Sequence, residues 1–152
     1  MIAVRKATLL DRAMIDVFID CACQEIDRYS KLGVNVDKVK GTVYSFIEND
    51  EHGVLFFAED DGVVCGAFMG GLSDEWQSDA RIAFDMINYV LPEHRSKGVA
   101  RELANSFIDW AKLKGAAAVQ CGTSTNVNTE HAKSLYSSLG FKEIGVFMEM
   151  TL

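Results

Sequence analysis

The sequence predicts a single α/β (α+β) domain over residues 1–152, with a mixed central sheet flanked by about four helices. A length of 152 residues is typical of one domain with a substantial core. The composition, 49% hydrophobic and 24% charged, is that of an ordinary globular protein. A single strand pattern comes first, several strand patterns then follow one another, and the last ones alternate with helix patterns. This order favours a mixed sheet.

The first half of the chain predicts one strand, two helices and a hairpin. Apolar residues at helical spacing mark the helices, and Thr8 is placed to cap the first of them. Asp61-Gly62 is a strong turn signal between two apolar runs, which indicates the hairpin. The predicted elements are, in order, a strand at 2–7, helices at 10–28 and 39–48, and hairpin strands at 54–59 and 63–70.

The second half alternates strands and helices. A loop at 73–79 precedes a long apolar strand, which Pro92 ends, and an amphipathic helix follows. The predicted elements are strands at 83–91 and 117–122, helices at 99–114 and 130–139, and a final pair of strands from 141 to 151.

The most informative stretch is the turn at 92–100, because it places cationic residues and a glycine at the start of a helix. The first N–H groups of a helix have no intrahelical partner, and the helix dipole is positive there, so such a turn can hold an anion with several oxygens. Gly98 permits close backbone approach, and Arg95 and Lys97 add full charges. The stretch therefore predicts a diphosphate site.

Two motifs give this site a family resemblance. The turn has the pattern R-x-x-G-x-A, whereas the sequence contains neither G-x-x-x-x-G-K-[ST] nor G-x-G-x-x-G. Residues 132–141 have the pattern A-x-x-L-Y-x-x-x-G-F. In this order and separation the two motifs resemble those of the GNAT N-acetyltransferase superfamily over nearly the whole chain.

The resemblance implies a twisted sheet that splays after its fourth strand, with acetyl-CoA as co-substrate in the splay and no metal. Main-chain groups on the strand before the turn would bind the pantetheine arm, and the turn would bind the pyrophosphate. The cofactor-binding residues expected on this basis are Asn88, Tyr89, Val90, Arg95, Ser96, Lys97, Gly98, Val99 and Ala100.

The resemblance also suggests catalytic residues for direct attack of an amine in a ternary complex, which needs no protein nucleophile. Tyr136 matches the tyrosine of the second motif and is the candidate general acid; the alternative is a tyrosine packed on an amphipathic helix. Asp85 lies near the position where some members hold a carboxylate base. A water chain is the alternative base, and Glu149 is a weaker rival to Asp85.

Two positions depart from the family pattern. The family often has Asn seven residues before the tyrosine, where this chain has Thr129, with Asn126 and Asn128 just upstream. Ser96 replaces a glycine of the loop, a change that fits only if the φ angle of Ser96 is negative.

The composition favours some classes of partner and of cellular location over others. A net charge of −7 disfavours nucleic acid and suits a cationic acceptor, which acidic residues such as Glu25 could attract; the alternative is that they are solvated surface charges. No apolar stretch is long enough to span a membrane, and no signal peptide is evident, so we expect a cytoplasmic protein. The four cysteines lack C-x-x-C spacing, which favours buried, reduced thiols over a metal site.

These observations predict an acetyl-CoA-dependent N-acetyltransferase with a primary amine acceptor, either a small molecule or a peptide. The alternative is a catalytically silent CoA-binding or interaction module on the same fold. The oligomeric state is not fixed by the sequence. A homodimer is one alternative, because the apolar stretch at 145–152 could form a strand that extends across a two-fold interface.

Overall fold

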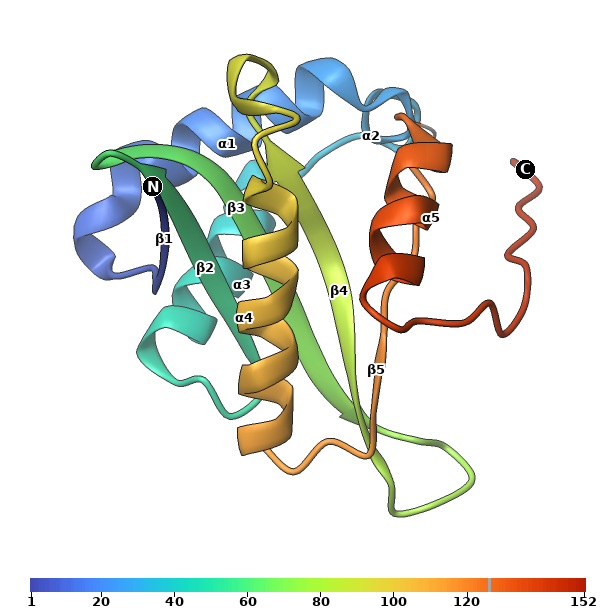
Figure 1. The fold of residues 1–152 in the computed structure, drawn as a ribbon. Helices are drawn as coiled ribbons and strands as arrows, with labels where there is room; N and C mark the ends of the chain where they lie inside the picture. The colour runs from blue at the N-terminus through green and yellow to red at the C-terminus, as the bar shows by residue number, and fades with distance from the viewer. Residues whose placement is uncertain (126) are drawn as a thin grey trace.

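The computed structural model describes residues 1–125 and 127–152. These described residues form five strands and five α-helices, with two short 3₁₀ turns, η1 and η2 (Figure 1). In chain order they are β1 (Ile2–Lys6), η1 (Leu9–Asp11), α1 (Arg12–Glu25), α2 (Asp27–Leu32), α3 (Val36–Glu48), β2 (Gly53–Asp60), β3 (Val63–Asp74), β4 (Arg81–Val90), η2 (Pro92–His94), α4 (Val99–Leu113), β5 (Ala118–Gln120) and α5 (Thr129–Ser138).

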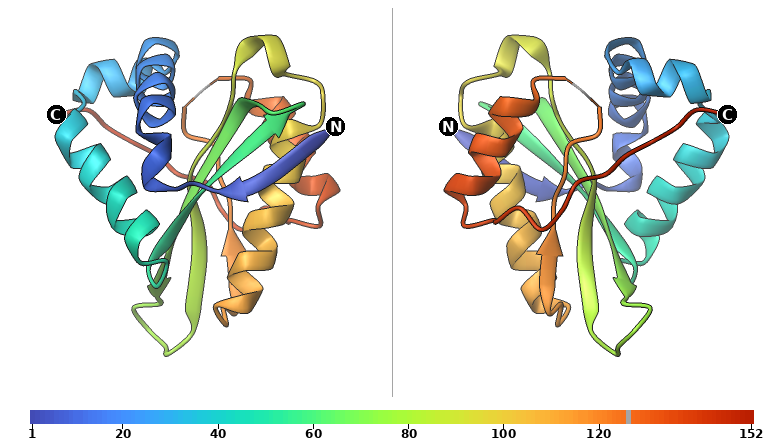
Figure 2. Two further views of the ribbon diagram at one scale, coloured as in Figure 1. Left: turned by 90° about the vertical axis from the view of Figure 1, so that its left-hand side faces the viewer. Right: turned by 90° about the vertical axis from the view of Figure 1, so that its right-hand side faces the viewer.

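The strands form one mixed sheet in the order β1-β2-β3-β4-β5, which confirms the predicted fold class. Strands β1 to β4 pair with one another in antiparallel fashion, and β5 pairs parallel to β4. Helices α4 and α5 cover one face, and α1 to α3 lie on the other (Figures 1 and 2). Strand β2 is buried on both faces: Phe56 packs in the cluster with α4, and Phe57 in the cluster with α1 and α3.

Glycines of β3 allow α4 to approach the sheet closely. A Cβ on Gly66 would lie 2.8 Å from Val99, and one on Gly70 would lie 2.3 Å from the ring of Phe107. Phe107 stacks on Phe68 with ring centroids 4.6 Å apart. This packing fixes the start of α4, and with it the turn that precedes it, against the end of β4.

The register of β3 against β4 shifts at Met69 and Gly70, which pair with Ile87 and Asp85. Met86 is therefore the extra residue of a β-bulge, and it is 41% exposed. The bulge lies where β4 leaves β5, so it changes the direction of the strand at the position of the predicted base.

Two sequence predictions need correction. The helix predicted at 10–28 is interrupted at Ile26, whose extended backbone (φ −97°, ψ 101°) separates α1 from α2; Thr8 caps η1, the turn that leads into α1. The strand pair predicted at 141–151 is absent, because these residues pair with no strand of the described chain. Their alternating pattern alone does not form a strand, since a strand needs a neighbour for its backbone hydrogen bonds.

Within residues 1–125 and 127–152, no helix is both long and apolar enough to cross a membrane.

Candidate active site

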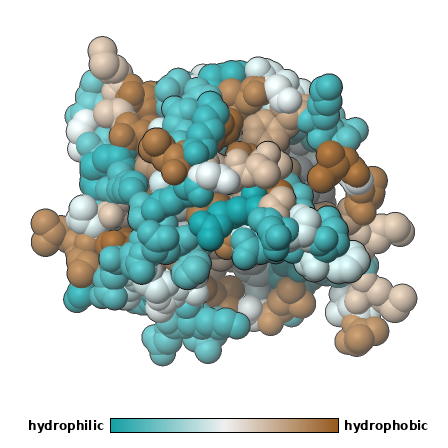
Figure 3. Space-filling view, turned by 90° about the horizontal axis from the view of Figure 1, so that it is seen from below, coloured by the Kyte–Doolittle hydropathy of each residue, from teal (hydrophilic) through white to brown (hydrophobic). Residues whose placement is uncertain are grey.

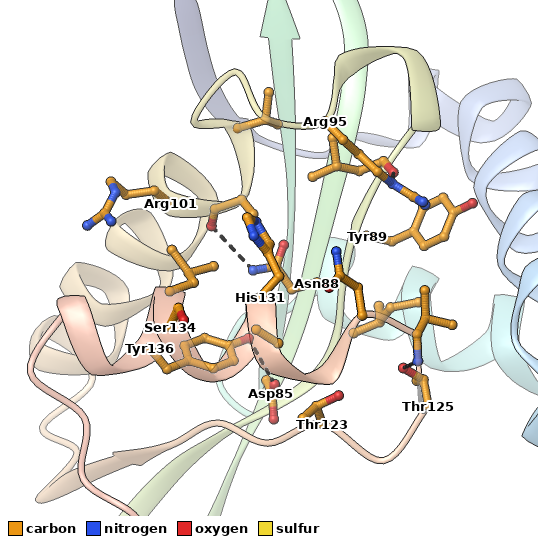
Figure 4. A pocket seen from close by; sticks show the side chains of 18 of the residues that line it. Asp85, Asn88, Tyr89, Arg95, Arg101, Thr123, Thr125, His131, Ser134 and Tyr136 are labelled. Carbon is orange, nitrogen blue, oxygen red and sulfur yellow. Dashed lines mark hydrogen bonds between the residues drawn. The ribbon is translucent and has the colours of Figure 1, made fainter.

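A cavity opens where β4 and β5 separate. The two strands pair over three residues only, and the last pair is Phe84 with Gln120. Beyond that pair lies a cavity of about 550 Å³ between β4, the start of α4, the segment after β5, and α5 (Figure 4). The backbone edge of β4 is no longer paired with β5 there, so it is available to an extended ligand.

Asp85 is the first residue of β4 after this last pair, and it lines the cavity. The backbone N–H of Gly122 donates to both of its carboxyl oxygens, at 3.1 and 3.3 Å. Burial nevertheless dominates, because a charged carboxylate loses solvation, and it raises the pKa of Asp85 to about 6. Asp85 can therefore accept or release a proton near neutral pH.

Tyr136 points from α5 into the same corner of the cavity (Figure 4). Its side chain is 9% exposed, packs against Phe141 at a ring-centroid distance of 5.4 Å, and donates its hydroxyl to Asp85 Oδ2 at 3.3 Å. Burial first, and then the charge of Asp85, raise the pKa of the phenol. Tyr136 is thus a neutral phenol that has a proton to donate.

Cys121 is the thiol close to this pair. Burial, followed by the charge of Asp85, raises its pKa, so it stays protonated and is a poor nucleophile. All four cysteines are free thiols, as the sequence predicted. Cys65 is fully buried, whereas Cys21, Cys23 and Cys121 are only partly buried, so the prediction that all four are buried was wrong.

The predicted diphosphate turn does form the start of α4. Gly98 adopts φ +83°, and a Cβ there would meet no protein atom within 4 Å, so the backbone angle is what requires a glycine. Its carbonyl accepts from the N–H groups of Arg101 and Glu102. Ser96 has φ +67°, so the condition under which serine was expected to fit in place of glycine, a negative φ, is not met. A left-handed backbone costs a non-glycine residue about 1 kcal/mol, which the turn sustains beside the cavity.

The charge of Arg95 is not free on the turn. Its guanidinium forms a two-point ion pair with Glu25 at the end of α1, at 2.8 and 2.6 Å, and donates through Nε to the carbonyl of Val90 at 3.0 Å. Tyr89 donates its hydroxyl to the same carboxylate at 2.5 Å, and its ring lies 5.5 Å from the guanidinium. Glu25, considered from sequence as an attractor for a cationic acceptor, instead ties α1 to β4 and the turn.

Lys97 does not line the cavity, because its ammonium points to Asp60 at 3.4 Å. The cation that lines the cavity from α4 is Arg101, which donates to Ser138 Oγ at 2.7 Å. Arg101 was not among the expected site residues; the available signal was a basic residue in the first helical turn, where acidic residues are usual. Hydroxyl and imidazole side chains that were not expected there also line the cavity, namely Thr123, Ser124, Thr125, His131 and Ser134.

The remaining expected residues line the cavity together: Asn88, Tyr89, Val90, Ser96, Val99 and Ala100. Asn88 Nδ2 donates to the carbonyl of Ala100 at 3.3 Å, which links β4 to α4, while its Oδ1 is buried with no partner in the described chain. Of the asparagines considered for the second motif, Asn128 lines the cavity and Asn126 lies outside the described residues.

These features fit a long co-substrate with a diphosphate. The start of α4 and Arg101 suit its phosphates, and the open edge of β4 suits an amide-bearing arm. The unpartnered Asn88 Oδ1 is an acceptor for an N–H group on such an arm. The arm would then lead to Asp85 and Tyr136.

The sequence model of the Acetyltransferase (GNAT) family matches residues 20–141. The chain belongs to this family. The resemblance drawn from the two motifs is therefore confirmed.

A curated relative, the probable N-acetyltransferase family 8 member 5 of Mus musculus, is 29% identical over 102 residues. The match covers 66% of this chain and 44% of the relative, so the chain spans less than half of that protein's length.

Solved structures share the fold. AAC(6')-Iy in complex with the bisubstrate analog CoA-S-monomethyl-acetylneamine has a TM-score of 0.75 at 20% identity, covering 100% of this chain and 99% of that one. A transcriptional regulator from Bacillus halodurans C-125 has a TM-score of 0.78 at 18% identity, with all of both chains covered.

Proposed function

We propose that this enzyme transfers the acetyl group of acetyl-CoA to a primary amine by direct attack in a ternary complex. The observation that carries the proposal is the contact between Asp85 and Tyr136 at the point where β4 leaves β5. A carboxylate with a pKa of about 6 and a neutral phenol are the base and the acid that such a transfer needs.

The two residues account for the protons. The amine attacks in its neutral form, after the proton of an ammonium group has passed to solvent. Its nitrogen forms a bond to the acetyl carbon while the bond from that carbon to sulfur breaks. Asp85 takes the proton that the amine loses, and Tyr136 gives a proton to the leaving thiolate. The hydrogen bond between them, 3.3 Å long, then returns the proton from Asp85 to the phenolate, and both residues are reset. A water chain in place of Asp85 is the second candidate for the base.

The proposed class of acceptor is inferred from the residues that line the cavity and from the net charge, and not from what a relative binds. Among the described residues, Asp85 is the one carboxylate that lines the cavity, and apolar and hydroxyl groups such as Ile26, Met86 and Thr123 line other parts of it. This lining and the net charge of −7 suit a cationic amine, either a small molecule or a peptide. The structure of AAC(6')-Iy, which has the same fold, holds the bisubstrate analog CoA-S-monomethyl-acetylneamine.

The test is the release of free CoA thiol from acetyl-CoA in the presence of a panel of primary amines, for wild type, Asp85→Asn and Tyr136→Phe. We expect each variant to lose about 10²- to 10⁴-fold in kcat while acetyl-CoA still binds. Wild-type kcat/KM should fall below a pH of about 6, where Asp85 becomes protonated. The matched controls are Asp109→Asn and Tyr44→Phe, which do not line the cavity.

Full activity of Asp85→Asn would assign the base to water, and full activity of Tyr136→Phe would remove the proposed acid. Binding of acetyl-CoA without turnover of any amine would favour the silent CoA-binding module over the transferase.

A further inference from the structure

The cavity at the candidate active site reaches both faces of the sheet, because β4 and β5 separate there. Val90 and Val99 line the cavity and pack in the core cluster with α4. Four other lining residues pack instead in the cluster with α1 and α3: Ile26, Ile87, Tyr89 and Val127. These four residues are termed the apolar end of the cavity.

The α4 side of the cavity holds the polar groups that suit acetyl-CoA. They are the start of α4, the guanidinium of Arg101 and the side-chain amide of Asn88, which donates to the carbonyl of Ala100. The acetyl group would lie at Asp85 and Tyr136, where β4 leaves β5. A co-substrate bound along the α4 side therefore leaves the apolar end for the acceptor.

The described residues provide a counter-ion for one ammonium group only. Asp85 is the one carboxylate among them that lines the cavity. The carboxylate of Glu25 lies next to the apolar end, but Arg95 and Tyr89 already donate to its two oxygens. The described polar side chains that line the cavity from the segment after β5 are neutral: Thr123, Ser124, Thr125 and Asn128. Because an ammonium group buried without a counter-ion is costly, this cavity disfavours an acceptor with a second positive charge.

The negative charge of the protein lies mostly outside the cavity. The chain has 22 Asp and Glu residues, of which Asp85 alone lines the cavity. Hydrophilic side chains cover much of the face of the molecule seen from below (Figure 3). Surface charge attracts cations at long range, whereas discrimination between bound amines depends on the groups that contact them. The choice of acceptor is therefore made by the lining of the cavity.

We infer that the acceptor is a primary amine with a single positive charge and an apolar chain or ring as its substituent, and not a polyamine or an aminoglycoside. This inference rests on the proposed function, because it assigns the acceptor of that reaction. The amine nitrogen lies at Asp85, and the substituent lies against Ile26, Ile87, Tyr89 and Val127. Each methylene group that becomes buried there should raise kcat/KM about fourfold.

The first test compares three amines of equal length that end in methyl, hydroxyl or ammonium: hexylamine, 5-amino-1-pentanol and 1,5-diaminopentane. The measurement is kcat/KM from the release of free CoA thiol. We expect hexylamine to exceed 1,5-diaminopentane by about 100-fold, with the amino alcohol between them. Butylamine, which is two methylene groups shorter, should fall roughly 16-fold below hexylamine. Turnover of 1,5-diaminopentane as fast as that of hexylamine would overturn the inference but leave the proposed acetyl transfer standing.

The second test places a carboxylate at the apolar end. Val127→Asp should move the ratio of the two kcat/KM values by about 100-fold toward 1,5-diaminopentane, because it supplies the second counter-ion. Val127→Asn has the same size without the charge, so it should weaken hexylamine turnover without favouring the diamine. Val63→Asp, on an exposed position of β3 outside the cavity, should leave the ratio unchanged. An equal shift in Val127→Asn and Val127→Asp would contradict the inference.

Binding separates the choice of acceptor from the reaction. Calorimetric titration of hexylamine and 1,5-diaminopentane into the protein saturated with free CoA involves no acetyl transfer. We expect hexylamine to bind about 100-fold more tightly than the diamine. Tighter binding of hexylamine without turnover of any amine would refute the proposed function and leave the apolar end as an amine-binding site. Equal binding of the two amines, or binding of neither, would refute the inference.

Discussion

Replacing Asp85 by Asn should stabilise the folded protein in a strongly pH-dependent way. The side chain keeps its shape, and the amide oxygen can still accept from Gly122 and Tyr136. What changes is the buried charge: above its pKa the carboxylate is ionised inside the cavity, where solvation is poor, whereas Asn stays neutral.

The size of the effect follows from the pKa of Asp85, which burial raises from 3.8 to about 6. A carboxyl group with a raised folded-state pKa contributes stability that is present below the unfolded value of 3.8 and is lost as the pH rises through 6. The full shift corresponds to about 3 kcal/mol. Between pH 4.5 and pH 8, the advantage of Asp85→Asn over wild type should therefore grow by about 2 kcal/mol.

The assay is urea unfolding of both proteins at pH 4.5 and pH 8, with Asp109→Asn as the control for an exposed carboxylate on α4. Groups that titrate equally in both proteins cancel in the difference between them. A difference that stays constant with pH, or an Asn variant that is less stable than wild type at pH 8, would refute the assignment of a destabilised, ionisable carboxylate to this position.

Three further changes test the contacts around the cavity and the core. Arg101→Gln should weaken acetyl-CoA binding about tenfold by calorimetry, and by more at low salt. Lys97→Gln should leave the affinity unchanged. Equal effects of the two substitutions would contradict the finding that Arg101 lines the cavity and Lys97 does not. Glu25→Gln should lower the free energy of unfolding by roughly 1 kcal/mol at pH 7. The difference from wild type should shrink below pH 4.5, because the ion pair with Arg95 lowers the pKa of Glu25. A loss of stability that does not change with pH would argue against the ion pair. Gly70→Ala should destabilise the fold by about 3 kcal/mol, since the new Cβ would lie 2.3 Å from Phe107. Gly41→Ala, in open space within α3, should instead stabilise the fold by roughly 0.5–1 kcal/mol. Thermal unfolding would show whether the two changes in stability differ in sign.

The fold class and the place of the site follow from local patterns. The hairpin at Asp61-Gly62 and the long helix after Gly98 appear where the sequence predicts them. Both depend on interactions close in sequence, namely turn geometry and helical periodicity. The contact between Asp85 and Tyr136 was not predictable from periodicity, because the two residues lie 51 positions apart and meet only through the order of the strands.

The features that the sequence did not predict also have physical reasons. The ion pair of Arg95 with Glu25 spans 70 positions, so no local pattern indicates that the loop arginine is already neutralised. Residues 141–151 show the opposite case. Their alternating pattern predicted a pair of strands, and this prediction was wrong, because strand formation depends on a neighbouring strand and these residues pair with none in the described chain.

The most direct test of the central claim, that acetyl-CoA binds between β4 and α4, is calorimetric titration of acetyl-CoA into wild type, Gly98→Trp and Gly115→Trp. Both glycines have positive φ angles and open space around them, and they lie at opposite ends of α4, so the backbone cost of the two substitutions is matched. We predict tight binding to wild type, loss of binding in Gly98→Trp and near-normal binding in Gly115→Trp. Absence of binding to wild type, or unchanged binding in Gly98→Trp, would contradict the assignment of this cavity to acetyl-CoA.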